Sequence, residues 1–213
     1  MLNEKELALL KSFQSVRMIG NDHIQSLRPV WDKVLAETDP DLAERINNLL
    51  PKEPVIHSIQ INANALYDCV LSSFYVAGMG TYAEGLFGDS LPIEKKFKMP
   101  IVEVKEYELE LVYASMAKGP IRPVTVKWLT EHGFRIQPHS SNDTLTFIEF
   151  KDPLKDKMNH LSVQLKVTDE HTFVFSKAGP KIPAITTLNY IKQDYDFGQT
   201  NPNEKEIYWV KTN

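Results

Sequence analysis

The sequence predicts an α+β fold, an antiparallel or mixed β-sheet with helices on one face, preceded by an N-terminal helical segment. Two observations predict it. Apolar residues recur at helical spacing through the first 50 residues, and from residue 101 onward short runs alternate between apolar and polar residues. Short polar turns separate these runs, which favours antiparallel pairing. We expect a helical segment or subdomain at 1–53 and an α+β domain at 54–213, either separate or forming one compact unit.

Three short amphipathic helices are predicted in the N-terminal segment. The apolar residues that share one face are Leu7, Leu10, Phe13 and Val16 in the first, Ile24, Leu27, Trp31 and Val34 or Leu35 in the second, and Leu42, Ile46 and Leu49 in the third. The second contains Pro29, so we expect a kink there or a helix that begins at this proline. The third has the clearest start, because Asp39 can cap its first turn and Pro40 suits its first position.

After Pro54 the pattern changes. Residues 55–61 are predicted to form a strand. Residues 64–77 are apolar on nearly all sides and favour a buried helix with Gly78 as a left-handed cap, although a strand is left open.

The second half of the chain is mostly β in pattern. The predicted strands are 107–113, 145–150, 161–167, 171–175 and 207–211. The third and fourth are expected to form a hairpin through the polar turn 168–170, with Leu161, Val163, Leu165 and Val167 facing the core. Two helices interrupt the strands. One runs from Pro123 to His132 and is followed by Gly133-Phe134; the other begins near Pro183, with Ile185, Leu188 and Ile191 on one face.

Composition indicates a soluble, cytoplasmic chain with no membrane partner. The 213 residues carry a net charge of −4, and the N-terminus is charged from its third residue, so we expect no signal peptide. No apolar run approaches the roughly 20 residues that span a bilayer. Cys69 is the single cysteine, which excludes an internal disulfide and fits a small buried hydrophobe.

The glycine-rich loop at 75–89 contains Gly78-x-Gly80-x-x-Ala83, a loose match to a dinucleotide-binding fingerprint. A dinucleotide site needs a long helix after the glycines, and further glycines and a proline follow here instead. We therefore predict no nicotinamide, flavin or other cofactor. The loop either tucks its aromatic residues onto the core or closes on a ligand or partner. In the second case the binding residues are Tyr82, Glu84, Phe87 and Asp89.

Histidines and acids show no metal-ligand spacing, so no metal site is predicted. His139 and Asp143 lie in a polar tip that contains the groups used in acid–base or nucleophilic chemistry. The same groups are common in any solvated turn, and that interpretation is favoured. These two residues are the weak catalytic candidates if the chain is an enzyme.

A basic stretch follows an acidic one. Lys118, Arg122, Lys127 and Arg135 lie between residues 118 and 135 and would form a nucleic-acid face if they converge. Four charges over this length are also common on an ordinary solvated surface, which is the favoured interpretation.

The functional hypothesis is a non-catalytic intracellular binding protein, a regulatory, accessory or inhibitory factor that acts through a macromolecular interface. We expect the partner to be another protein and leave a homo-oligomer open. One alternative is an enzyme whose catalytic residues are scattered in sequence, with a hydrolase as one such enzyme. The other alternative is a nucleic-acid-binding protein that uses the stretch 118–135.

Overall fold

The computed structural model describes most of the N-terminal and C-terminal thirds of the chain. The described residues are 2–13, 21–52, 69–78, 121–139, 142, 144–152, 154, 157–177, 183–194 and 205–212. Their helices are α1 (Glu4–Phe13), α2 (Asn21–Leu35), α3 (Pro40–Leu49), α4 (Cys69–Val76), α8 (Ile121–Glu131) and α9 (Leu188–Asp194). Their strands are β1 (Phe134–Gln137), β2 (Thr146–Asp152), β3 (Lys157–Val167), β4 (Thr172–Ser176), β5 (Ala184–Thr187) and β6 (Lys205–Lys211).

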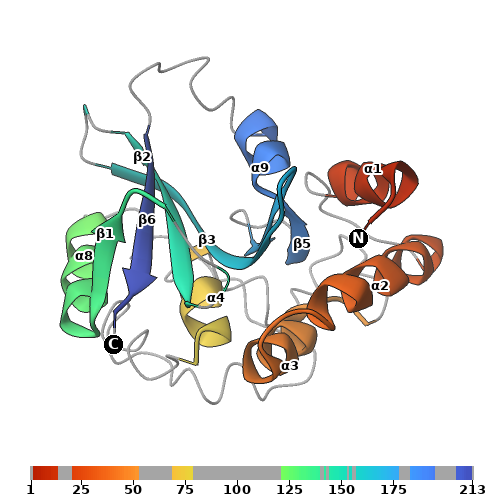
Figure 1. Ribbon diagram of the computed structural model, residues 1–213, viewed down its shortest axis with the longest axis horizontal. Helices are drawn as coiled ribbons and strands as arrows, with labels where there is room; N and C mark the ends of the chain where they lie inside the picture. The colour runs from red at the N-terminus through yellow and green to blue at the C-terminus, as the bar shows by residue number, and fades with distance from the viewer. Residues whose placement is uncertain are drawn as a thin grey trace, which may run out of the picture.

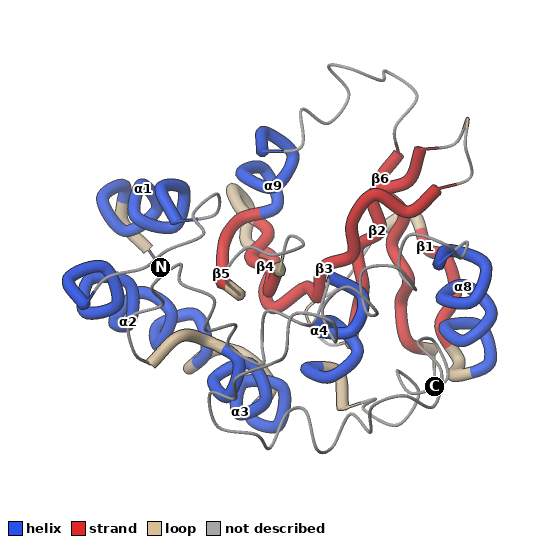
Figure 2. Tube along the Cα trace, turned by 180° about the vertical axis from the view of Figure 1, so that it is seen from behind, coloured by secondary structure: helices blue, strands red, loops and turns tan. Residues whose placement is uncertain are grey.

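The described strands form one six-stranded sheet in the order β1-β6-β2-β3-β4-β5, and every neighbouring pair is antiparallel. α8 lies beside β1 at one end of the sheet, α1 and α2 lie toward β5 at the other end, and α3 lies beside α4 (Figure 1). α4 packs against β3 between them, as the view from behind also shows (Figure 2). The α+β class is therefore confirmed.

The main core lies between the sheet and helices α1, α2, α3, α4 and α8. Inward residues of the strands, such as Phe147, Leu161 and Phe175, meet the buried faces of these helices. α9 instead packs on the opposite face, where Leu188 and Ile191 contact a smaller apolar cluster of strand residues. Among the described helices, α9 therefore partly covers one face and the others pack on the opposite face.

Local sequence explains where the N-terminal helices begin. Asn3 and Glu6 form a reciprocal capping box at α1, with the Asn3 amide donating to Glu6 Oε2 and the Glu6 amide donating to Asn3 Oδ1. At α3, Asp39 Oδ1 accepts from the Leu42 amide at 3.0 Å, and proline follows at the first helical position, as predicted. α2 continues through Pro29 from Asn21, so a start at the proline is wrong.

The β3–β4 hairpin is confirmed as an antiparallel pair. Leu161, Val163 and Leu165 are buried, whereas Val167 at the end of the strand is half-buried. The strand does not alternate regularly, because a bulge between Gln164 and Lys166 shifts the register. The bulge turns the Lys166 side chain to the face that carries Phe173, its partner on β4.

The predicted helix near Pro183 is partly wrong. Residues 184–187 form strand β5, and the helix begins only at Leu188. The β-branched run Ile185-Thr186-Thr187 suits an extended strand, and pairing with β4 satisfies its backbone. Ile185 therefore faces the main core, while Leu188 and Ile191 pack on the other face.

Other predicted elements are confirmed over the residues that the structure describes. Residues 69–76 are helical, and Gly78 follows them with a φ of 78° in the left-handed region. Trp128, Leu129 and Phe134 are buried around α8, and Gly133 follows the end of this helix with a φ of 79°. The predicted strands 55–61 and 107–113 lie outside the described residues, and the boundary at 53/54 stays a prediction.

Candidate functional site

A hollow of about 260 Å³ opens where the N-terminal helices meet the β3–β4 hairpin. We call it the hairpin groove. Its lining residues are Leu2, Lys33, Val34, Glu37, Lys166, Thr168, Asp169, Glu170, His171 and Phe173. These residues come from three separate parts of the sequence, so the groove exists only once α2 has packed against the sheet.

The floor of the hairpin groove is apolar. Val34 from α2 and Phe173 from β4 are both buried, and Leu2, just before α1, is half-buried. Trp31 donates its indole N–H to the carbonyl of Ile185 at 3.3 Å, which ties α2 to β5 behind this floor. The floor is therefore held by core packing, and its shape is set when the domain folds.

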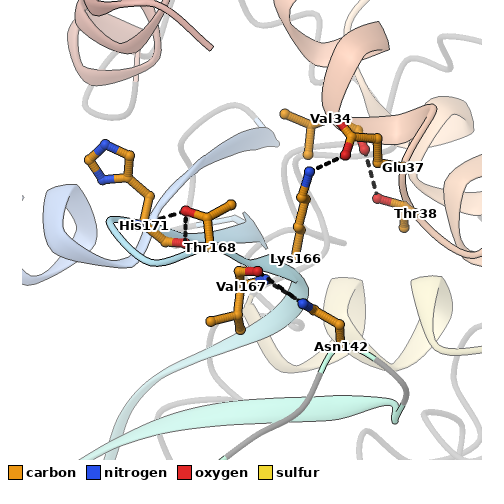
Figure 3. A network of polar contacts seen from close by, with 8 residues as sticks. All are labelled: Val34, Glu37, Thr38, Asn142, Lys166, Val167, Thr168 and His171. Carbon is orange, nitrogen blue, oxygen red and sulfur yellow. Dashed lines mark hydrogen bonds and ion pairs between the residues drawn. The ribbon is translucent and has the colours of Figure 1, made fainter. Parts of the chain in front are cut away.

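Hydrogen bonds fix the turn that forms one wall. Thr168 and His171 close the turn, because the Thr168 amide and hydroxyl donate to the His171 carbonyl at 2.8 and 3.0 Å. The His171 amide in turn donates to Thr168 Oγ1 at 2.9 Å. Asn142 holds the preceding residue, since its side chain donates to the Val167 carbonyl at 2.9 Å and accepts from the Val167 amide at 2.5 Å (Figure 3).

Two ion pairs link the walls. Lys166 on β3 reaches Glu37 just beyond α2, and Lys33 on α2 reaches Glu6 on α1. Hydrogen bonding to Lys166 lowers the pKa of the Glu37 carboxyl, and hydrogen bonding to Lys33 lowers that of Glu6. In Figure 3 the Lys166 side chain extends toward Glu37, while the His171 ring points away from this pair.

A second hollow of about 210 Å³ is also lined by residues of β3 and of the N-terminal helical region. Thr38 and Leu165, which line it, are the chain neighbours of Glu37 and Lys166, which line the hairpin groove. The Lys166–Glu37 ion pair therefore forms part of the wall of the hairpin groove, and both hollows are lined by residues of β3 and of the N-terminal helical region.

The structure describes only one residue of the predicted catalytic pair. His139 is exposed just after β1, and Asp143 lies outside the described residues. Asn142, between them, has a structural role in holding Val167. The predicted binding residues Tyr82, Glu84, Phe87 and Asp89 all lie outside the described residues, so that hypothesis stays a prediction.

The structure places three of the four basic residues and leaves out Lys118. Arg122 is half-buried, and its Nε donates to Glu149 Oε1 at 2.6 Å. Arg135 is exposed and donates to the carbonyls of Thr130 and Phe134, both at 2.8 Å. Lys127 is exposed, with its ammonium 3.8 Å from Glu131. These contacts give Arg122 a role inside the fold, whereas nucleic-acid binding by the stretch stays a prediction.

One buried contact resembles a nucleophile and its base. His160 Nε2 lies 2.8 Å from Ser176 Oγ, within the range used in nucleophilic catalysis. Both residues are buried, on the sheet face opposite the main core. The pair lies on adjacent strands and matches no local motif, which is why the sequence did not reveal it.

The hairpin groove could not be predicted from the sequence either. Residues 168–170 were predicted as a polar turn, but no pattern near them in the sequence indicates that this turn lies close to α2 and Leu2. Among the described residues, no group of three or more histidine, cysteine, aspartate or glutamate side chains is placed to hold a metal ion. Within the same residues no helix has the length and apolar character to cross a bilayer. The chain matches no family model, no curated protein and no solved structure.

Proposed function

We propose that this chain is a non-catalytic intracellular binding protein, an accessory, regulatory or inhibitory factor, and that the hairpin groove is part of its interface with another protein. The observation that carries this proposal is a pair of small hollows, of about 260 and 210 Å³, which are both lined by residues of β3 and of the N-terminal helical region. The Lys166–Glu37 ion pair forms part of the wall of the first.

The size of the hollows favours a protein partner over a small-molecule substrate. Pockets that enclose a metabolite or drug-sized ligand occupy about 300–1,000 Å³ and bury most of the ligand. Each hollow here is smaller than that range. Shallow pockets of this size accept single side chains, which is how protein interfaces anchor a partner.

The groove is also preformed. Its floor belongs to the core, and the Thr168–His171 turn is closed by its own hydrogen bonds. A binding site that is already ordered loses little conformational entropy when a partner docks, so more of the interaction energy is available as affinity.

The test is a peptide-display selection against the folded chain, followed by calorimetry on the selected peptides. Glu170→Trp places an indole at the mouth of the groove, because Glu170 is exposed and lines it. Glu131→Trp, at an exposed position on α8, is the matched control. We expect Glu170→Trp to weaken binding at least about tenfold, equal to 1.4 kcal/mol, and the control to leave it unchanged.

Two results would contradict the proposal. The first is a selection that yields no saturable peptide for the folded chain. The second is peptides whose affinity is the same for Glu170→Trp, Glu131→Trp and the unaltered chain, which would place the interface elsewhere. Thermal unfolding of each variant checks that the substitution has left the fold intact.

A further inference from the structure

We infer that the hairpin groove takes a basic side chain, lysine or arginine, from the partner protein. This inference rests on the proposed function and adds the chemistry of the anchor residue. It follows from how charge and apolar surface are distributed around the groove.

The charges of the groove do not balance. Its two lysines are each matched by a carboxylate, Lys33 by Glu6 and Lys166 by Glu37. Asp169 and Glu170 form no ion pair with any residue that the structure describes, and both are exposed at the tip of the hairpin. The groove is left with two carboxylates on one wall, and these attract a cation.

The apolar floor fits the stem of the same side chain. Lysine and arginine carry three or four methylene groups below the charged head, and these groups bury well against apolar surface while the head stays near water. Val34 and Phe173 provide that surface in the groove. The Phe173 ring lies edge-on to the His171 ring, with centroids 6.1 Å apart, so the wall next to the turn is aromatic.

Other occupants fit less well. A phosphate or an acidic side chain would meet Asp169 and Glu170 with like charge, while the lysines that could attract it are already paired. A purely apolar side chain would contact the floor but form no ionic contact with the two carboxylates. Among side chains, only lysine and arginine combine an apolar stem for the floor with a cation for the carboxylates.

The test is an NMR titration of the whole chain with blocked single amino acids. The probes are the N-acetyl methylamides of lysine, arginine, norleucine and glutamate, where norleucine provides an apolar stem of similar length without the charge. We expect saturable shifts of the backbone amides at 166–173 with the lysine and arginine probes. Norleucine should bind at the same amides about two- to fivefold more weakly, the effect of losing an exposed ionic contact.

A pair of matched variants isolates the two carboxylates. Asp169→Asn with Glu170→Gln removes the unpaired charges from the groove, and Glu44→Gln with Glu131→Gln removes the same number from exposed positions on α3 and α8. In the first variant the lysine probe should bind only as tightly as the norleucine probe, whereas in the second the lysine probe should still bind more tightly. Added salt should also reduce the difference in affinity between the two probes, because the carboxylates are exposed.

The outcomes separate this inference from the proposed function. Norleucine binding as tightly as lysine would overturn the basic anchor and leave the groove as a binding site. Tightest binding of the glutamate probe would also overturn it, with the opposite sign of charge. No shift at 166–173 with any probe up to its solubility limit would overturn the basic anchor, while the peptide selection tests the groove itself.

Discussion

Two ion pairs connect helical regions to the adjacent strands β2 and β3, one beside α8 and the other just beyond α2, and they differ mainly in burial. At the α8 end, Arg122 and Glu149 have side chains only 12% and 0% exposed. At the α2 end, Lys166 and Glu37 are 24% and 49% exposed. The two pairs therefore differ in the strength of their charge–charge interaction, because this strength depends on the dielectric environment.

The Arg122–Glu149 pair belongs to the interior. Glu149 points from β2 into the main core side of the sheet, where its second oxygen accepts the indole N–H of Trp209 at 2.8 Å. Both carboxylate oxygens thus have a donor, which offsets the cost of placing the charge in the core. Trp128 from α8 packs beside this site against Phe74, with ring centroids 4.2 Å apart. The α8 end of the sheet is therefore filled by packed side chains.

The Lys166–Glu37 pair lies at the surface, in the wall of the hairpin groove. An exposed pair contributes about 0–1 kcal/mol, so it orients the hairpin against α2 more than it stabilises the fold. The hairpin groove lies beside it. The comparison indicates that the α8 end holds the fold together, while the α2 end has room for a partner.

The largest expected effect is at the α8 end. Arg122→Ala should lower the free energy of unfolding by about 3–5 kcal/mol, because it leaves the Glu149 carboxylate buried without its cation. The measurement is urea unfolding followed by tryptophan fluorescence, with Lys166→Ala as the counterpart at the other end. Lys166→Ala should cost at most about 1 kcal/mol. Equal losses for the two variants would remove the distinction between the ends.

A smaller effect is expected when pH falls at the α2 end. The pKa values of Glu6 and Glu37 are lowered in the fold by their lysine partners, from an ordinary value of 4.5. A lowered pKa in the folded chain means that these pairs stabilise it above pH 4.5 and that this contribution is lost as pH falls below that value.

The acid effect can be measured by hydrogen exchange near the hairpin. Amides of α2 and of residues 166–168 should lose protection as pH drops below 4.5, after correction for the intrinsic exchange rate. In Glu37→Gln the acid-dependent part of this loss should shrink, since the carboxyl that titrates is gone. An unchanged acid response in Glu37→Gln would show that this pair does not hold the hairpin.

Local patterns predicted much of this fold. The cap at Asp39 and the glycine after α8 were correct because each depends on residues within one turn of the helix. Strand β5 was misassigned because Ile185, Leu188 and Ile191 also fit a helical face, and only pairing with β4 decides between the two. Strand β1 was not predicted either, since its pairing with β6 joins segments far apart in the sequence.

The functional regions were harder to predict than the elements. The sequence predicts Arg122 on a solvated surface, with phosphate contact as the alternative, but it cannot show that Glu149 lies across from it, because β2 and α8 meet only in the folded chain. The hairpin groove joins Leu2, α2 and residues 166–173 in the same way. Sites of this kind are set by tertiary packing, and no spacing along the chain encodes them.

The smallest expected effect concerns Lys127, on the exposed side of α8. Its side chain is 71% exposed and its partner Glu131 is 52% exposed, with 3.8 Å between the charged atoms. Lys127→Ala should change the free energy of unfolding by less than about 0.5 kcal/mol, as for an ordinary surface position. If the stretch 118–135 instead contacts nucleic acid, the same variant should weaken binding to all sequences alike and reduce the log–log salt slope by about one. A gel-shift titration at several salt concentrations decides between these outcomes. We expect no salt-dependent shift, because Arg122 is already paired inside the fold and Lys127 has Glu131 beside it, which leaves too little free charge, even with the exposed Arg135, to hold a phosphate backbone.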